Sequence, residues 1–128
     1  MTAAAVVDTS CLVALAFGEP EATRTVTRLR RFDRLFASAL LEAELLAAFR
    51  RERAEADVSD FTKDLAFVSP DRPLSMELRR VADAGYLRGA DMWHVACALF
   101  LSPDPGELTF LTLDQDQRTV ARRLGFVV

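Results

Sequence analysis

Short runs of apolar residues alternate along the chain with longer stretches of helical periodicity. The first apolar run closes at Val6 and Val7, and capping residues at positions 8–10 then predict a helix that begins near Cys11. Further strands are predicted at 35–37, 67–68, 108–113 and 126–128, and further helices at about 20–31, 38–53, 58–65, 74–84, 91–101 and 115–124. This alternation predicts an α/β fold with a mostly parallel sheet covered by helices on both faces. Ligands then belong at the carboxyl ends of the strands.

The length of 128 residues allows one hydrophobic core and therefore one domain, spanning residues 1–128. Apolar residues make up 51% of the chain and charged residues 27%, a balance typical of globular rather than disordered proteins. No segment reaches the roughly 18 uncharged apolar residues of a membrane span. The apolar stretch from Ala3 to Val7 has neither the length nor the basic flank of a signal peptide. We therefore expect no membrane association and a cytoplasmic location.

The net charge of −3 differs from the strongly basic charge expected of a simple nucleic-acid-binding domain. It does not exclude nucleic acid, because carboxylates around a metal ion make a site acidic while arginines elsewhere hold phosphate. The basic residues are nearly all arginine, with Lys63 as the single lysine. Cys11 and Cys97 lie in apolar runs without the spacing of a zinc site, and we interpret both as buried thiols.

Three aspartates occupy positions where the predicted topology brings side chains to one edge of the sheet. Asp8 follows the first strand, Asp114 follows the strand at 108–113, and Asp91 opens the most apolar helix. Helix capping explains each of them singly. Together they form a cluster of carboxylates that repel one another and raise one another's pKa unless a cation compensates. Mg²⁺ or Mn²⁺ takes oxygen ligands of this kind.

The helix predicted at 38–53 supplies a fourth acid, for which there are two candidates, Glu42 and Glu44. Two positions on an α-helix are separated by about 200°, so both carboxylates cannot face one site. Each has apolar neighbours at helical spacing. Periodicity alone does not choose between them.

The segments that carry these acids resemble the PIN-domain ribonucleases and, within that family, the VapC-type toxins of bacterial toxin–antitoxin pairs. The resemblance covers nearly the whole chain and depends on the order and spacing of five segments: VVDTS at 6–10, SALLEAELL at 38–46, LRGADMWHVA at 87–96, LTLD at 111–114 and ARRLGF at 121–126. It implies a three-layer α/β/α PIN-like domain with a central, mostly parallel sheet. It also implies a Mg²⁺- or Mn²⁺-dependent endoribonuclease that leaves a 3′-hydroxyl and a 5′-phosphate.

The resemblance assigns roles to individual residues. The family's middle acid follows a small residue and precedes an apolar pair, which favours Glu44 over Glu42. Asp8 and Asp91 match the core metal ligands, and Asp114 matches the fourth acid. Three further residues match accessory positions, either as a second acid or as hydroxyls near a ligating carboxylate or water: Asp116, Ser10 and Thr112.

One histidine and several arginines have both a functional and a structural interpretation. His94, the only histidine, stands three residues after Asp91 and has the chemistry of a general base, but the resemblance favours a packing position. A first group of arginines, on and just after the helix predicted at 20–31, could guide RNA, and Arg88 or Arg118 could reach phosphate; a solvated helix face is the alternative for most of them. The arginines of the first group are Arg24, Arg28, Arg30, Arg31 and Arg34.

The partners that the resemblance implies are an RNA substrate, a VapB-type antitoxin and a second copy of the chain in a homodimer. Other function classes stay open: a PIN-like module that binds without cleaving, and a housekeeping PIN nuclease without an antitoxin. A phosphatase or phosphoryl-accepting domain would need a second acid or an opposing lysine near Asp8, where Thr9, Ser10 and Cys11 stand instead. The sequence does not identify the RNA target or the number of metal ions.

Overall fold

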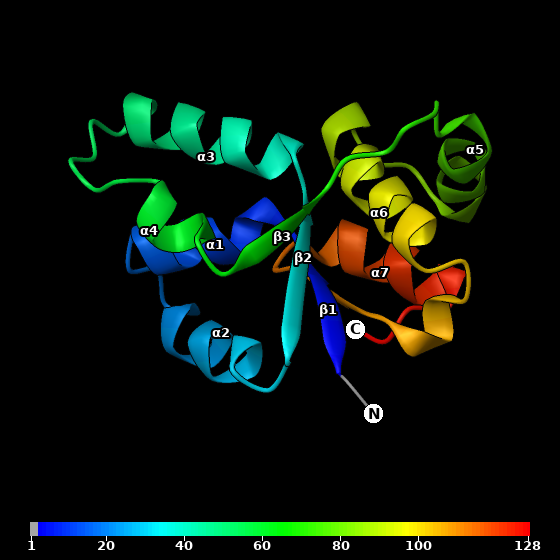
Figure 1. Ribbon diagram of the computed structural model, residues 1–128, viewed down its shortest axis with the longest axis horizontal. Helices are drawn as coiled ribbons and strands as arrows, with labels where there is room; N and C mark the ends of the chain where they lie inside the picture. Colours follow the sequence, from blue (N-terminus) through cyan, green and yellow to red (C-terminus); the bar gives the residue numbers. More distant parts are fainter. Residues whose placement is uncertain (1–2) are drawn as a thin grey trace.

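A four-stranded parallel sheet forms the centre of the molecule in the computed structural model, which describes residues 3–128 (Figure 1). The strands are β1 (Ala4–Val7), β2 (Arg34–Ser38), β3 (Leu65–Val68) and β4 (Thr109–Leu111). Their order is β3-β2-β1-β4, and every neighbouring pair is parallel. The predicted α/β fold with a parallel sheet is therefore confirmed.

Helices cover both faces of this sheet. In Figure 1 the helices of the first half of the chain lie to the left and those of the second half to the right. The first group comprises α1 (Thr9–Ala16), α2 (Ala22–Leu29), α3 (Leu40–Arg51) and α4 (Ser59–Thr62); the second comprises α5 (Ser75–Ala84), α6 (Gly89–Leu101) and α7 (Gln115–Leu124). A short 3₁₀ turn, η1 (Pro105–Glu107), precedes β4.

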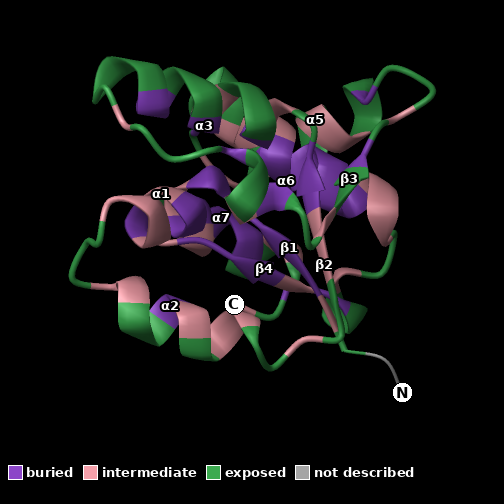
Figure 2. Ribbon diagram, turned by 60° about the vertical axis from the view of Figure 1, so that its left-hand side comes forward, coloured by how far each residue is buried: buried purple, intermediate pink, exposed green. Residues whose placement is uncertain are grey.

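Strand β1 divides the apolar interior into two clusters because its side chains alternate between the faces. Ala5 and Val7 pack with Leu41 of α3, whereas Val6 packs with Val95 of α6. Figure 2 shows the buried residues concentrated along the sheet and the inner faces of the helices. Burial of β1 on both faces explains why its sequence is a continuous apolar run rather than an alternating one.

The strand order creates a crevice between β1 and β4. From β1 the chain adds β2 and then β3 on one side, and it later returns to place β4 on the other side. The place where the strand order reverses in this way is called a switch point. The helices after the two strands there lie on opposite faces of the sheet, which leaves a gap at the carboxyl ends of these strands. Asp8 directly follows β1, and Asp114 begins the helix after β4.

Several predicted elements are shorter than expected, two of them because of tertiary pairing. The helix predicted at 58–65 is reduced to α4, because Leu65 pairs with Leu35 and begins β3 instead. The strand predicted at 126–128 is a single bridge between Thr109 and Val127, with Phe110 N donating to Val127 O at 2.8 Å. In both places tertiary pairing outweighs the local pattern.

Helices α3 and α6 begin at different residues than predicted. Ser38 was expected to open α3 but ends β2, and its Oγ accepts a hydrogen bond from Leu40 N at 3.1 Å. Asp91 was expected to open α6 but is the third residue of that helix, which begins at Gly89. Among residues 3–128, no helix combines the length and the apolar character that a membrane span requires.

Gly85 ends α5 as its place in the sequence suggests, but the reason is close packing. Its backbone is extended, so its conformation does not require glycine. A Cβ atom at this position would lie 3.0 Å from Val120 Cγ2 and 3.3 Å from Arg123 Nη1. Arg123 Nη1 in turn donates to Ala84 O at 2.9 Å. The missing side chain therefore allows α7 to approach the end of α5.

Candidate functional site

Asp8 follows β1 at the switch point of the sheet and is only 4% exposed. Its backbone N–H donates to Leu111 O at 2.9 Å, which extends the pairing of β1 with β4 by one residue. Its carboxylate caps α1 by accepting from Ser10 N at 3.0 Å. It also accepts from Gln117 Nε2 at 3.2 Å and lies 3.4 Å from Thr112 Oγ1. These donors hold a buried carboxylate in a single orientation.

Gln117 connects three of the segments that form the crevice, and its role was not predicted from the sequence. Its side chain is fully buried on α7. Besides Asp8, its Nε2 donates to Asp91 O at 3.2 Å, and its Oε1 accepts from Thr112 Oγ1 at 2.6 Å. One feature of the sequence indicated its importance: Gln117 is polar but lies at helical spacing from the buried Val120 and Ala121, where an apolar residue is expected.

Asp114 and Asp91 line a cavity of about 380 Å³. Asp114 is the N-cap of α7, and its Oδ1 accepts from Gln117 N at 2.9 Å. Within residues 3–128 no side chain or backbone N–H donates a hydrogen bond to the Asp91 carboxylate. The remaining residues that line this cavity, which we call the acidic cavity, are Tyr86, Leu87, Arg88 and Asp116.

The environment of Asp91 raises the pKa of its carboxyl above the usual 3.8. Burial is the largest cause, followed by the negative charges of Asp8, Asp114 and Glu44. Asp8, Glu44 and Asp114 therefore lie close enough to Asp91 for their negative charges to act on its carboxyl. Among residues 3–128, side chains from other elements donate hydrogen bonds to Asp8 and Glu44 but not to Asp91 or Asp114.

Glu44 faces the crevice, whereas Glu42 is exposed on another face of α3. Glu44 Oε1 accepts from Thr9 Oγ1 at 2.7 Å and lies 2.5 Å from His94 Nε2. The hydrogen bond with His94 lowers the pKa of Glu44; burial opposes this shift, and the bond from Thr9 adds to it. The geometry thus chooses between the two glutamates that periodicity left equivalent.

His94 is buried in α6 and joins the two sides of the crevice. Its Nε2 contacts Glu44 and lies 3.9 Å from Asp8 Oδ1. Burial lowers the pKa of His94, but the bond with Glu44 and the charges of Asp8 and Glu44 outweigh burial and raise the pKa above its usual 6.5. Its Nδ1 has no hydrogen-bond partner among residues 3–128. The side chain is placed to orient Glu44 and is closed off from solvent.

The accessory residues lie on α1, on the loop between β4 and α7, and in the first turn of α7. Ser10 Oγ accepts from Leu113 N at 3.0 Å and lies 3.3 Å from Thr112 Oγ1. Thr112 Oγ1 also accepts from Asp114 N at 3.1 Å. Asp116 is exposed at the rim of the acidic cavity. Ser10 and Thr112 therefore hold the loop that carries Asp114 against α1.

The two cysteines are free and buried, on α1 and α6. Burial raises the pKa of Cys11 to about 12 and that of Cys97 to about 11. Because the thiolate is the nucleophile and the metal ligand, neither side chain is prepared for covalent catalysis or zinc binding at neutral pH.

The donor set of the crevice fits a hard divalent cation that keeps most of its water. Within residues 3–128, no three acidic, histidine or cysteine side chains approach closely enough to enclose an ion. Mg²⁺, however, is commonly held by one or two carboxylates, with water completing its coordination. Asp8 and the unbonded carboxylate of Asp91 are oxygen donors of this kind, and a cation would offset the repulsion that raises the pKa of Asp91.

A parallel α/β sheet with carboxylates gathered at its switch point defines the class of this protein as an α/β domain with an acidic site. Residues 5–123 match the family model of the PIN domain, and the chain therefore belongs to the PIN-domain family. Members of this family are generally nucleases that use divalent metal ions. No curated protein and no solved structure gives a significant match to the chain.

Proposed function

We propose that this protein is a metal-dependent endoribonuclease whose site consists of Asp8, Glu44, Asp91 and Asp114. The observation that carries the proposal is the Asp91 carboxylate, which lies in the field of the three other acids without a hydrogen-bond donor among residues 3–128. A divalent cation between Asp8 and Asp91 would remove this repulsion. Nuclease function is typical of the PIN-domain family to which the chain belongs.

The four acids have two kinds of role in the proposed reaction. Asp8 and Asp91 would hold Mg²⁺ or Mn²⁺, with Glu44 and Asp114 as further ligands, directly or through water. When bound, the ion supplies a more acidic water for in-line attack and offsets charge on the phosphate. Gln117 keeps Asp8 oriented, and His94 does the same for Glu44. The products would be a 3′-hydroxyl and a 5′-phosphate, and no side-chain nucleophile is required.

Purified protein incubated with RNA and Mg²⁺ or Mn²⁺ tests the proposal. We expect the wild-type protein to cleave RNA, chelation to stop cleavage, and Asp8→Asn and Asp91→Asn to reduce it to background. Asp83→Asn is the matched control, because Asp83 is exposed on α5 and lies outside the acidic cavity. Cleavage by Asp8→Asn and Asp91→Asn at the wild-type rate would contradict the proposal.

We further propose that the protein is the toxin of a type II, VapBC-type toxin–antitoxin pair. The support is the resemblance of the segments at 6–10, 38–46 and 87–96 to VapC-type toxins. A VapB-type antitoxin could place an arginine among the acids, which form a natural target for a cation. The match to the PIN domain leaves the phosphatase alternative without support.

Expression in a bacterial host distinguishes this role from the other PIN-like functions. A toxin should arrest growth, Asp91→Asn should not, and co-expression of a small neighbouring gene should restore growth. Cleavage in vitro without growth arrest would favour a housekeeping nuclease, and neither cleavage nor arrest would favour a binding module.

We also propose that the protein forms a homodimer, as its resemblance to the VapC-type toxins implies. Light scattering on the purified protein would measure its molar mass against the 14.2 kDa of one chain. A mass near twice that value is expected, and the mass of a single chain at all concentrations would contradict a homodimer.

A further inference from the structure

A second polar cavity, of about 390 Å³, adjoins the acidic cavity and is lined mainly from α2 and α7. We call it the arginine cavity; its lining residues are Glu21, Arg24, Thr25, Arg28, Leu113, Gln115 and Arg118. Leu113 and Gln115 flank Asp114, which lines the acidic cavity. The segment at 113–115 therefore separates a cationic cavity from the carboxylates.

The three arginines have no anionic partner within residues 3–128, where none of them forms an ion pair. Arg28 and Arg118 are half-buried and Arg24 is exposed. The only hydrogen bond from their guanidinium groups to the described residues runs from Arg118 Nη2 to Thr112 O at 3.0 Å. Since each guanidinium carries five N–H donors, most of the donor capacity is available to a ligand.

The positive charges of Arg28 and Arg118 both act on the thiol of Cys11. Both lower the pKa of Cys11 against the larger effect of burial, so both positive charges lie near the start of α1 although they come from opposite ends of the chain. Among the described residues, Glu21 is the only acid that lines the arginine cavity, against three cations. Arg28 and Arg118 are partly desolvated and form no ion pair there, so binding of an anion would offset the cost of their desolvation.

We infer that the arginine cavity binds a phosphodiester group of the RNA strand next to the one that is cleaved. This inference rests on the proposed function. The guanidinium fork matches the geometry of phosphate oxygens and binds them through two parallel hydrogen bonds. The four acids repel the RNA backbone, and three arginines across the segment at 113–115 offset that repulsion. The cavity thereby sets which phosphodiester reaches the acids.

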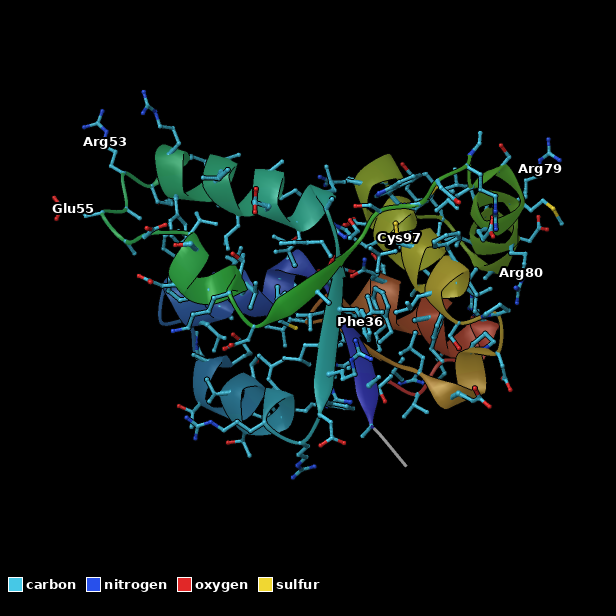
Figure 3. The ribbon with its side chains drawn as sticks, in the orientation of Figure 1. Phe36, Arg53, Glu55, Arg79, Arg80 and Cys97 are labelled. Atoms are coloured by element: carbon cyan, nitrogen blue, oxygen red, sulfur yellow. The ribbon has the colours of Figure 1, made fainter. Side chains whose placement is uncertain are left out.

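Binding of a single-stranded RNA oligonucleotide to the non-cleaving Asp91→Asn protein tests the inference. The double variant Arg24→Gln and Arg28→Gln, made in this protein, should bind about 10-fold more weakly. The slope of log affinity against log salt should fall by about 0.7, the value for one lost phosphate contact on a single strand. The matched control, Arg79→Gln with Arg80→Gln, removes the same charge from exposed positions on the outer side of α5 (Figure 3) and should change neither quantity.

A second arm identifies the ligand as a phosphate of the strand. Uncharged methylphosphonates are placed at one position after another along the oligonucleotide. A methylphosphonate at one position should lower the affinity of the Asp91→Asn protein about 10-fold. The same methylphosphonate should have no effect on the protein that also carries Arg24→Gln and Arg28→Gln. If no position shows this coupling, the cavity does not bind a strand phosphate, whether it binds free phosphate, an acidic peptide or nothing.

The controls separate folding and catalysis from the inference. The double variant Arg24→Lys and Arg28→Lys keeps the charge and should restore the salt slope, whereas a folding defect would not be rescued. If wild-type protein cleaves RNA but the glutamine variant binds like its control, the inference is wrong and the proposed function stands. If wild-type protein does not cleave RNA but the coupled phosphate is found, the proposed function is wrong and the cavity is still a phosphate site.

Discussion

Gln117 Nε2 donates to Asp8 Oδ1 at 3.2 Å, joining residues that lie 109 positions apart in the chain. The same amide nitrogen donates to Asp91 O, and the amide oxygen accepts from Thr112. One buried side chain thus connects Asp8, at the start of α1, with the helix that carries Asp91. Second-sphere contacts of this kind orient ligating carboxylates and contribute to metal affinity.

Gln117→Leu removes these hydrogen bonds while keeping a similar side-chain volume. We expect the free energy of unfolding to fall by about 1–3 kcal/mol, because buried groups of Asp8 and Thr112 lose their partner. Metal affinity or RNA cleavage should fall by about 10- to 100-fold. Urea unfolding and cleavage assays measure the two effects. Wild-type stability and wild-type cleavage together would show that the contact does not support the site.

Glu44 and Glu42 provide a matched pair for testing the fourth acid. Glu44→Gln should reduce cleavage strongly, because it removes a negative charge that contacts His94 and Thr9. Glu42→Gln should leave cleavage unchanged and alter stability by no more than about 0.5 kcal/mol, as is usual for an exposed position. Greater loss of cleavage in Glu42→Gln than in Glu44→Gln would place Glu42 in the site instead.

Asp91→Asn should stabilise the metal-free protein at neutral pH. The pKa of Asp91 in the fold lies above its usual 3.8, so the ionised carboxylate is less favourable in the folded than in the unfolded chain. This penalty is absent below about pH 3.8, grows as the pH rises through the interval up to the folded-state pKa, and is complete above it. Thermal unfolding across this range should therefore show a gain for Asp91→Asn that disappears in acid.

Divalent metal should reverse this ranking of stability. Mg²⁺ that binds the folded protein raises its stability with increasing concentration, and Asp91→Asn should gain much less than wild type. Asp83→Asn should gain as much as wild type, since its side chain is exposed on α5. Equal stabilisation of wild type and Asp91→Asn by Mg²⁺ would mean that Asp91 does not hold the ion.

Gly85→Ala should destabilise the fold by about 1–3 kcal/mol, the range for overpacking. The added Cβ would lie 3.0 Å from Val120 Cγ2 and would push α7 away from α5. Gly89→Ala is the control, because a Cβ there meets no atom within 4 Å, and a change of at most about 1 kcal/mol towards greater stability is expected. Chemical unfolding measures both; equal stability of the two variants would contradict close packing at Gly85.

Much of the fold could be predicted because its signals are local. Helix α7 begins and ends at the predicted residues, since Asp114 caps its start and Gly125, in the left-handed conformation, ends it. Asp8 caps α1 in the same way. By contrast, the pattern at 58–65 predicted a helix, and pairing of Leu65 with Leu35 made its end a strand. At Leu65 the helical preference of the local sequence was weaker than the stabilisation that comes from pairing with β2.

The candidate site was predictable to the extent that it follows from topology. A parallel α/β alternation places residues after β1 and β4 at one edge, so Asp8 and Asp114 could be brought together from the sequence alone. Gln117 could not, because a polar residue within an apolar helix face has many explanations until its partners are known. The arginine cavity likewise depends on the approach of α2 to α7.

The sequence by itself determined the α/β class, the caps of α1 and α7 and the edge of the sheet where the acids gather, because these depend on periodicity and on interactions between residues close in the chain. Only the tertiary structure decided that Glu44 rather than Glu42 faces Asp8, since both have apolar neighbours on α3 and the choice depends on where Thr9 and His94 lie. It also decided that Asp91 has a raised pKa, because that shift is the sum of burial and charges contributed by three other segments of the chain.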